Sequence, residues 1–156
     1  METVTRVLEP AILLEEYRRL LQDETIDALP LVVSGSSMTP FLRHQQDTVY
    51  LSRLTRPVRK GDILLYRRDN GIYVLHRVWK TGRAGFTMVG DAQAEPEPGI
   101  RPDQVIAIVT SAVCGGKRLA PGSLRWEFYE KIWIRAVSLR PYLHRCSMWI
   151  RHLCRR

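Results

Sequence analysis

Short runs rich in Val, Ile, Leu and Tyr recur along the chain between residues 29 and 113, separated by Gly, Pro, Asn and Asp. Runs of this length and composition, bounded by turn-forming residues, are typical of β-strands rather than helices. Six strands are predicted: "LPLVV", "TVYLS", "DILLYRR", "IYVLHRVW", "GFTMVG" and "QVIAIVTSAV". The pattern therefore predicts a mostly antiparallel β domain.

The stretch "YRRDNGIYVLHR" contains the clearest turn signal of the chain. Asn70-Gly71 between two β-rich runs favours a hairpin with a two-residue turn. Such a turn pairs Asp69 with Ile72 and Leu65 with His76. Because side chains alternate across a strand, four residues of the second strand then share one face: Ile72, Val74, His76 and Val78.

Apolar residues recur at helical spacing on both sides of the β region. Near the start, "PAILLEEYRRLLQD" places Leu13, Tyr17, Leu20 and Leu21 on one helical face, and Pro10 suits a first helical turn. Near the end, "LRWEFYEKIWIRAVSL" repeats Phe128, Tyr129, Ile132, Trp133, Ala136 and Val137, and a second stripe follows Pro141. We therefore expect an N-terminal amphipathic helix within residues 1–29, a β-rich core over 30–116 and a basic amphipathic segment over 117–156.

The charge of the chain is concentrated in its last quarter. The 156 residues suit one domain and carry a formal net charge of +8. Residues 117–156 contain ten Lys or Arg and two acids, whereas the 14 basic and 14 acidic residues before them cancel. A neutral body with a basic, Trp-containing tail favours contact of the tail with an anionic membrane surface over general binding of nucleic acid. The alternative is that the tail packs on the domain.

No apolar run reaches the roughly twenty residues that a membrane-spanning helix needs, and no signal peptide is visible at the start. We expect a peripheral membrane-associated or cytoplasmic protein. The tail also holds His144, Cys146, His152 and Cys154, but residues two apart on a helix point about 200° away from each other. We therefore predict no metal site, and nothing in the sequence indicates a cofactor.

The stretch "VVSGSSMTPFL" raises the question of chemistry, because it gathers three serines beside a methionine and a proline. Alone, such a stretch is typical of a turn, and a lone histidine on a strand is typical of a core position. Four patterns occur in order, however: "GSSMTP", "DTVYLS", "KGDILLYRR" leading into "VLHRV", and "VGDAQAEPEPG" followed by "DQVIAIV". Each pattern alone is common in proteins, but the four in this order and spacing are a more specific signal.

In this order the patterns resemble the type I signal peptidase family, whose fold and serine nucleophile are shared with LexA-type self-cleaving repressors. The resemblance covers roughly residues 31–110. It implies a mainly β, signal peptidase/LexA-like antiparallel catalytic core. It also implies a serine endopeptidase that acts on an extended peptide or a precursor protein. Members of this family are usually anchored by transmembrane helices, which this chain lacks.

The resemblance assigns roles residue by residue. Ser37, the serine directly before the methionine, matches the nucleophile, rather than Ser34 or Ser36. His76 stands where many bacterial members have a lysine base, as in the Ser/His branch of the family. A neutral imidazole can accept the serine proton near pH 7, because its ordinary pKa is about 6.5. An apolar face helps to keep His76 neutral, and we expect its pKa to lie between about 6 and 7.

The group that orients the histidine is less sharply defined by the resemblance. The Ser/His branch uses an acidic residue after a Gly-Asp motif, which here is Gly90-Asp91. Spacing ranks Glu97 first, with Glu95 and Asp91 as competitors. Some members also place a serine hydroxyl two residues before the nucleophile to stabilise the oxyanion. This chain has Gly35 there, so Ser36 or Ser34 would have to substitute.

A second reading belongs to a different class of protein. The β core could be a catalytically inactive module, with the basic tail binding an anionic membrane or nucleic acid. The presence of both Ser37 and His76 at matching positions favours the peptidase.

Overall fold

The computed structural model describes residues 10–23 and 25–140, and it consists mainly of one antiparallel β-sheet. The sheet has eight strands, and neighbouring strands follow the order β1-β2-β7-β3-β4-β5-β6, with β8 paired to β7. The prediction of a mainly antiparallel β protein is confirmed. The six predicted strands correspond to β1 Leu29–Val32, β2 Thr48–Ser52, β3 Ile63–Arg67, β4 Tyr73–Gly82, β5 Gly85–Val89 and β7 Val105–Cys114.

Two short strands are present where none was predicted. β6 covers Glu97–Ile100 and pairs with β5, and β8 covers Lys117–Leu119 and pairs with β7. Proline and glycine within β6 and charges within β8 conceal them, because these residues are depleted in strands. The sheet thus extends past residue 116, where we expected the helical segment to begin.

The middle of the sheet is buried on both faces, and this is why strand β3 reads as an unbroken apolar run. Ile63 and Leu65 face one apolar cluster, and Leu64 and Tyr66 face another. All four side chains are at most 2% exposed. Burial on both faces removes the alternation that a half-exposed strand shows.

The β3–β4 hairpin differs by one residue from its predicted register. Leu64, not Leu65, lies opposite His76, and Arg67 lies opposite Tyr73. The cause is a turn of three residues instead of two, because Arg68 N–H donates to the carbonyl of Ile72 and Gly71 N–H donates to Arg68. Gly71 has φ +84°, a backbone conformation that glycine adopts without steric cost. The shift places Tyr66 and His76 on the same face of the sheet.

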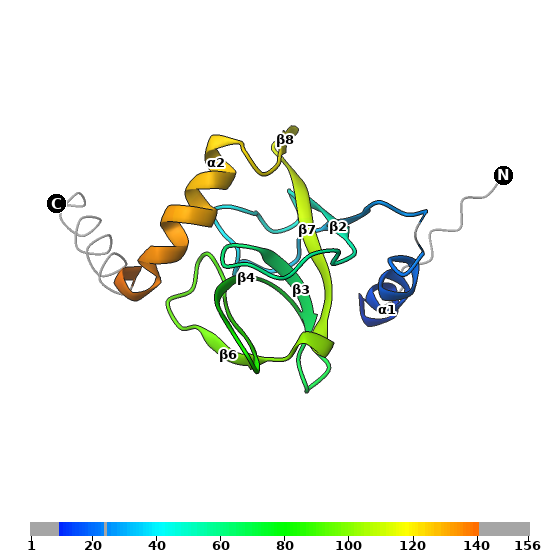
Figure 1. Cartoon of the computed structure of the whole chain (residues 1–156). Coiled ribbons are helices and arrows are strands. Elements are labelled where there is room, and N and C mark those ends of the chain that lie inside the picture. The colour runs from blue at the N-terminus through cyan, green and yellow to red at the C-terminus, as the bar shows by residue number, and fades with distance from the viewer. Residues whose placement is uncertain (1–9, 24, 141–156) are drawn as a thin grey trace.

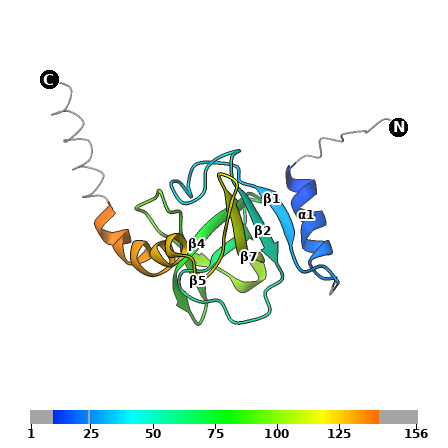
Figure 2. The same cartoon turned by 90° about the horizontal axis from the view of Figure 1, so that it is seen from above.

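The helical segments lie on opposite sides of the sheet, as two views at right angles show (Figure 1 and Figure 2). The N-terminal helix α1, Pro10–Leu20, ends beside β1, where the Tyr17 hydroxyl donates to the carbonyl of Pro30 at 2.6 Å. Leu14 and Leu21 are buried in the larger apolar cluster. The predicted N-terminal helix is thus present over the described residues and packs on the sheet.

The C-terminal helical segment begins with α2, Leu124–Glu127, continues as a π-helical turn, Phe128–Ile132, and ends as a 3₁₀ helix, Trp133–Leu139. Trp126, Ile134 and Val137 are buried, but Phe128 and Ile132 of the predicted apolar stripe are exposed. The predicted stripe is thus divided between buried and exposed positions, because the segment does not keep the constant period of an α-helix. The wider turn and the tighter 3₁₀ turns rotate the later residues relative to an α-helix.

Within the described residues, no helix combines the length and the apolar character needed to cross a membrane. The second predicted stripe of the tail, after Pro141, lies outside the described residues.

Candidate active site

Ser37 and His76 line the same pocket, which has a volume of about 240 Å³. The serine comes from the turn after β1, and the histidine comes from the middle of β4. The wall is completed by residues of the 33–38 segment, of the β3–β4 hairpin and of the loop after β5: Val33, Ser34, Gly35, Met38, Arg68, Tyr73, Val74, Leu75 and Gln93. A nucleophile candidate and a base candidate far apart in the sequence are thus brought to one cavity.

The backbone of Ser37 is held by the loop that carries the Gly-Asp motif. Ala92 N–H donates to the carbonyl of Ser37 at 2.8 Å. A Cβ atom at Gly90 would lie 2.5 Å from that same carbonyl oxygen, so only glycine permits this approach. Met38, the next residue, is 2% exposed and is anchored in the apolar core. The motif therefore fixes the position of the nucleophile candidate.

The 90–93 loop is fixed in turn by the C-terminal helical segment. Arg140 is fully buried, and its guanidinium donates to the carbonyls of Gly90 at 2.8 Å and Gln93 at 2.7 Å. Trp133 Nε1 donates to the carbonyl of Asp91 at 2.8 Å. The helix is thus connected to Ser37 through one loop.

His76 is 3% exposed and lies opposite Leu64 of β3 in the sheet. Burial, followed by the charge of Arg68, lowers the pKa of His76 to about 4, although the charge of Glu97 acts in the opposite direction. The expectation of a neutral imidazole agrees with this shift, but the expected value of 6 to 7 was too high. The sequence did not indicate how completely the sheet would cover the ring.

Glu97 reaches His76 through the hydroxyl of Tyr66. The Tyr66 oxygen lies 3.2 Å from His76 Nδ1 and 2.8 Å from Glu97 Oε2, whereas His76 Nδ1 and Glu97 Oε2 are 4.0 Å apart. Arg68 donates to both carboxylate oxygens of Glu97 at 2.6 Å. Burial of Glu97 opposes its ionisation, but hydrogen bonds from Arg68 and Tyr66 outweigh it, so the pKa of Glu97 is lowered.

The other two acidic candidates lie elsewhere. Asp91 is fully buried, and its two carboxylate oxygens accept hydrogen bonds from Arg77 at 3.0 and 2.9 Å. This ion pair supports the sheet and the 90–93 loop, and it does not involve His76. Glu95 is exposed. Of the three acids, only Glu97 is brought to the histidine.

The remaining sequence candidates separate clearly. Ser34 and Ser36 are both exposed, but only Ser34 is among the residues that line the Ser37 pocket. Gly35 has φ +90°, so a serine there would be strained, and its N–H donates to His44 Nδ1 at 2.9 Å. No lysine is among the residues that line the pocket. Lys80 lies over the ring of Trp79, 4.1 Å from its centroid.

Sequence reasoning missed Tyr66 and Arg68. Both belong to the run "DILLYRR", which was interpreted as a strand and as part of the family resemblance, with no role assigned to either residue. The available signal was the hydroxyl of Tyr66 in an otherwise apolar run, since a buried tyrosine hydroxyl usually has a hydrogen-bond partner. The one-residue error in the hairpin register hid its position relative to His76.

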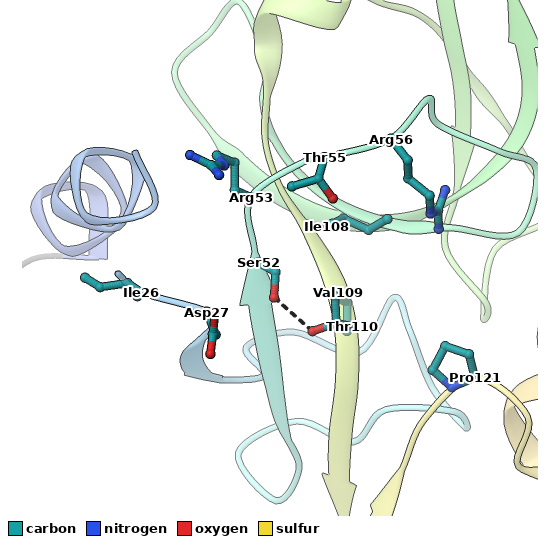
Figure 3. A pocket seen from close by; sticks show the side chains of 10 residues that line it. All are labelled: Ile26, Asp27, Ser52, Arg53, Thr55, Arg56, Ile108, Val109, Thr110 and Pro121. Atoms are coloured by element: carbon teal, nitrogen blue, oxygen red, sulfur yellow. Dashed lines mark hydrogen bonds between the residues drawn. The ribbon is translucent and has the colours of Figure 1, made fainter. Parts of the chain in front are cut away.

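A larger pocket, of about 440 Å³, lies away from Ser37 between the segment before β1, β2 and β7 (Figure 3). Ser52 and Thr110 share a hydrogen bond of 3.0 Å there, and Arg56 is paired with Asp62. None of the residues that line it is a histidine, cysteine or lysine. The pair of Ser37 and His76 has no counterpart among the residues that line this larger pocket.

Neither a search of protein-family models nor a search of curated protein sequences gave a match for this chain. Ser37 and His76 in one pocket, with Tyr66 between His76 and Glu97, are the features of the structure that bear on function.

Proposed function

We propose that the protein is a signal peptidase-like serine endopeptidase in which Ser37 is the nucleophile and His76 is the general base. The observation that supports this most strongly is that both residues line one pocket, with the histidine buried and connected to an ionised carboxylate. The signal peptidase/LexA-like fold is part of the same proposal. The antiparallel sheet and the contact of the Gly-Asp loop with Ser37 support it.

The reaction proceeds through an acyl-enzyme. Ser37 Oγ attacks the carbonyl carbon of the scissile peptide bond while His76 accepts the hydroxyl proton. The C–N bond then breaks, and the same proton passes to the leaving amine. A water molecule, deprotonated by His76, attacks the acyl-enzyme, and the proton returns to Ser37 as the product acid leaves.

The substrate is an extended peptide or a segment of a precursor protein. β1 is the terminal strand of the described sheet order, and its Pro30 carbonyl already accepts a hydrogen bond from Tyr17 of α1. An extended substrate would therefore add to the outer edge of the chain beyond Pro30, toward Ser37. An apolar pocket of about 400 Å³ shares Val33, Ser34, Tyr73 and Leu75 with the Ser37 pocket. An apolar side chain beside the scissile bond fits this neighbouring pocket.

A serine-directed fluorophosphonate probe tests the nucleophile without knowledge of the natural substrate. We expect the wild type to be labelled, and Ser37→Ala and His76→Ala to lose essentially all labelling. Because nucleophile and base act as one unit, the double variant should be no worse than either single variant. Ser52→Ala, in the larger pocket, is the matched control and should be labelled like the wild type.

The inactive-module reading makes the opposite prediction. A wild-type protein that is folded but not labelled, or a His76→Ala variant labelled at the wild-type rate, would contradict the Ser/His mechanism. Cleavage of a quenched fluorescent peptide with alanine one and three positions before the scissile bond then measures peptidase activity directly. The alanines follow the small residues that the family resemblance implies.

A further inference from the structure

We propose that Tyr66 is a positioning residue that carries the orienting effect of Glu97 to His76 and fixes which ring nitrogen holds the proton. The inference deepens the proposed function, because it takes His76 as the base. It concerns a residue to which the family resemblance assigned no role. The inference is drawn from the contacts of one hydroxyl group that lies between an imidazole and a carboxylate.

The number of protons available determines the direction of each hydrogen bond. An ionised carboxylate only accepts hydrogen bonds, so the Tyr66 hydroxyl must donate its single proton to Glu97 Oε2, 2.8 Å away. The Tyr66 oxygen then has only lone pairs for His76 Nδ1 at 3.2 Å. His76 Nδ1 must therefore carry a proton, which leaves Nε2 without one and able to accept the proton of Ser37.

The surroundings keep each group in the state that this arrangement requires. Arg68 donates to both oxygens of Glu97 and favours the carboxylate. Tyr66 is fully buried, and burial together with Glu97 raises its pKa, so the hydroxyl retains its proton. The register between β3 and β7 also shifts between Leu65 and Tyr66, a local irregularity of the kind that redirects a side chain.

Direct contact between the acid and the histidine is not available in this arrangement. The closest recorded approach of Glu97 to Nδ1 is 4.0 Å, beyond hydrogen-bond distance. Loss of the Tyr66 hydroxyl therefore leaves the Nδ1–H group without an acceptor and removes one donor from Glu97. The imidazole is then free to adopt the other tautomer, in which Nε2 carries a proton and cannot accept one from Ser37.

The first test is NMR of protein labelled with ¹⁵N-histidine, at pH 7. His76→Gln identifies the His76 signals by their disappearance. In the wild type we expect Nδ1 of His76 to be protonated and Nε2 to be bare. In Tyr66→Phe we expect a mixture of tautomers or the Nε2–H form. Tyr50→Phe makes the same chemical change, loss of a tyrosine hydroxyl, but in β2. It is the control and should keep the wild-type tautomer of His76.

The second test is kinetic. Tyr66→Phe should lower kcat by about 10- to 100-fold, as expected for losing a hydrogen bond to a charged group, with KM unchanged. Thermal unfolding of both phenylalanine variants shows whether the loss reflects stability alone. A wild-type His76 in the Nε2–H form overturns the inference, and so does a Tyr66→Phe variant that matches Tyr50→Phe in tautomer and kcat. If the tautomers behave as expected but Ser37 is not labelled by the fluorophosphonate, the proposed function fails and the role of Tyr66 in positioning His76 stands.

Discussion

At the scale of single residues, the charge of His76 depends on two neighbours of opposite sign. Burial favours the neutral ring, the Arg68 guanidinium acts in the same direction, and Glu97 favours the imidazolium; together they lower the pKa of His76 to about 4. A base with so low a pKa is fully deprotonated at neutral pH, but it accepts a proton less readily than an ordinary imidazole. The site thus combines full availability of the base with a modest driving force for proton transfer.

The pH profile of the proposed peptidase activity should report this pKa of His76. Only the neutral ring can act as base, so kcat/KM should rise as the pH increases through about 4 and stay level across neutrality. Replacing Arg68 by Met removes a charge that lowers the pKa of His76 and leaves the charge of Glu97 without its partner. Both changes favour the imidazolium, so the acidic limb of the Arg68→Met profile should move to higher pH.

Arg67→Met is the matched control, because Arg67, the last residue of β3 and the neighbour of Arg68 in sequence, is exposed and pairs with Glu15 rather than Glu97. Its acidic limb should coincide with that of the wild type. The comparison uses the position of the limb and not the absolute rate, since Arg68 also lines the pocket. An acidic limb above pH 8, or no movement in Arg68→Met, would argue against His76 as the base.

At the scale of secondary-structure elements, the C-terminal helical segment supports the 90–93 loop. Arg140 reaches three carbonyl groups, those of Gly90, Gln93 and Trp133, at 2.7 to 3.1 Å. Its charge also lies over the ring of Trp133, 4.8 Å from the centroid. Because Ala92 of the same loop holds the Ser37 carbonyl, a change at Arg140 can reach the nucleophile without touching the pocket.

We predict that Arg140→Met lowers the free energy of unfolding by about 3 kcal/mol, because buried carbonyl groups lose their donors. The rate of fluorophosphonate labelling at Ser37 should fall as well, in conditions where the variant is still folded. Urea unfolding measures the first effect and labelling time courses the second. Arg135→Met, an exposed arginine of the same segment, is the control and should change neither. Equal behaviour of the two variants would mean that Arg140 does not support the loop.

The elements also show what the sequence could and could not reveal. Six strands and the helix before them were predictable, because their apolar periods are local properties of the chain. The register of the β3–β4 hairpin could not be predicted, since Asn70-Gly71 fits both a two-residue and a three-residue turn. The resemblance proposed Ser37, His76 and Glu97 as site residues. The place of Tyr66 between His76 and Glu97 depends on that register and on the distant strand β6.

At the scale of the whole molecule, positive charge and exposed apolar side chains occur together on the C-terminal segment. Residues 117–156 carry a net charge of +8. On the described part of this segment, Leu124 is 91% exposed and Ile132 and Leu139 are each 59% exposed. Buried residues of the same segment, such as Trp126 and Val137, attach it to the sheet. The segment thus both packs on the core and presents an apolar and basic surface outward.

We propose that this surface brings the protein to anionic membranes, where a precursor substrate would be found. Each Lys or Arg near such a surface contributes on the order of 1 kcal/mol, screened over about 10 Å at 0.1 M salt. Binding to vesicles containing phosphatidylserine should therefore exceed binding to neutral vesicles and weaken with added salt. Insertion of exposed apolar side chains should leave a part that resists salt. Vesicle co-sedimentation at several salt concentrations measures both parts.

Two variants separate the contributions. A chain ending at Arg140 keeps every described contact of the helix with the 90–93 loop but loses four of the ten basic residues, so it should bind vesicles less and still cleave a short soluble peptide. In the full chain, the double variant Leu124→Asn, Ile132→Asn should lose the salt-resistant part alone. Ile72 is 53% exposed on the β3–β4 hairpin, outside the C-terminal segment. Ile72→Asn is therefore the control for the double variant and should keep the salt-resistant binding. Should the full-length protein ignore anionic vesicles at low salt, or bind single-stranded DNA more tightly than the vesicles, the membrane proposal fails, because the charge then serves another partner.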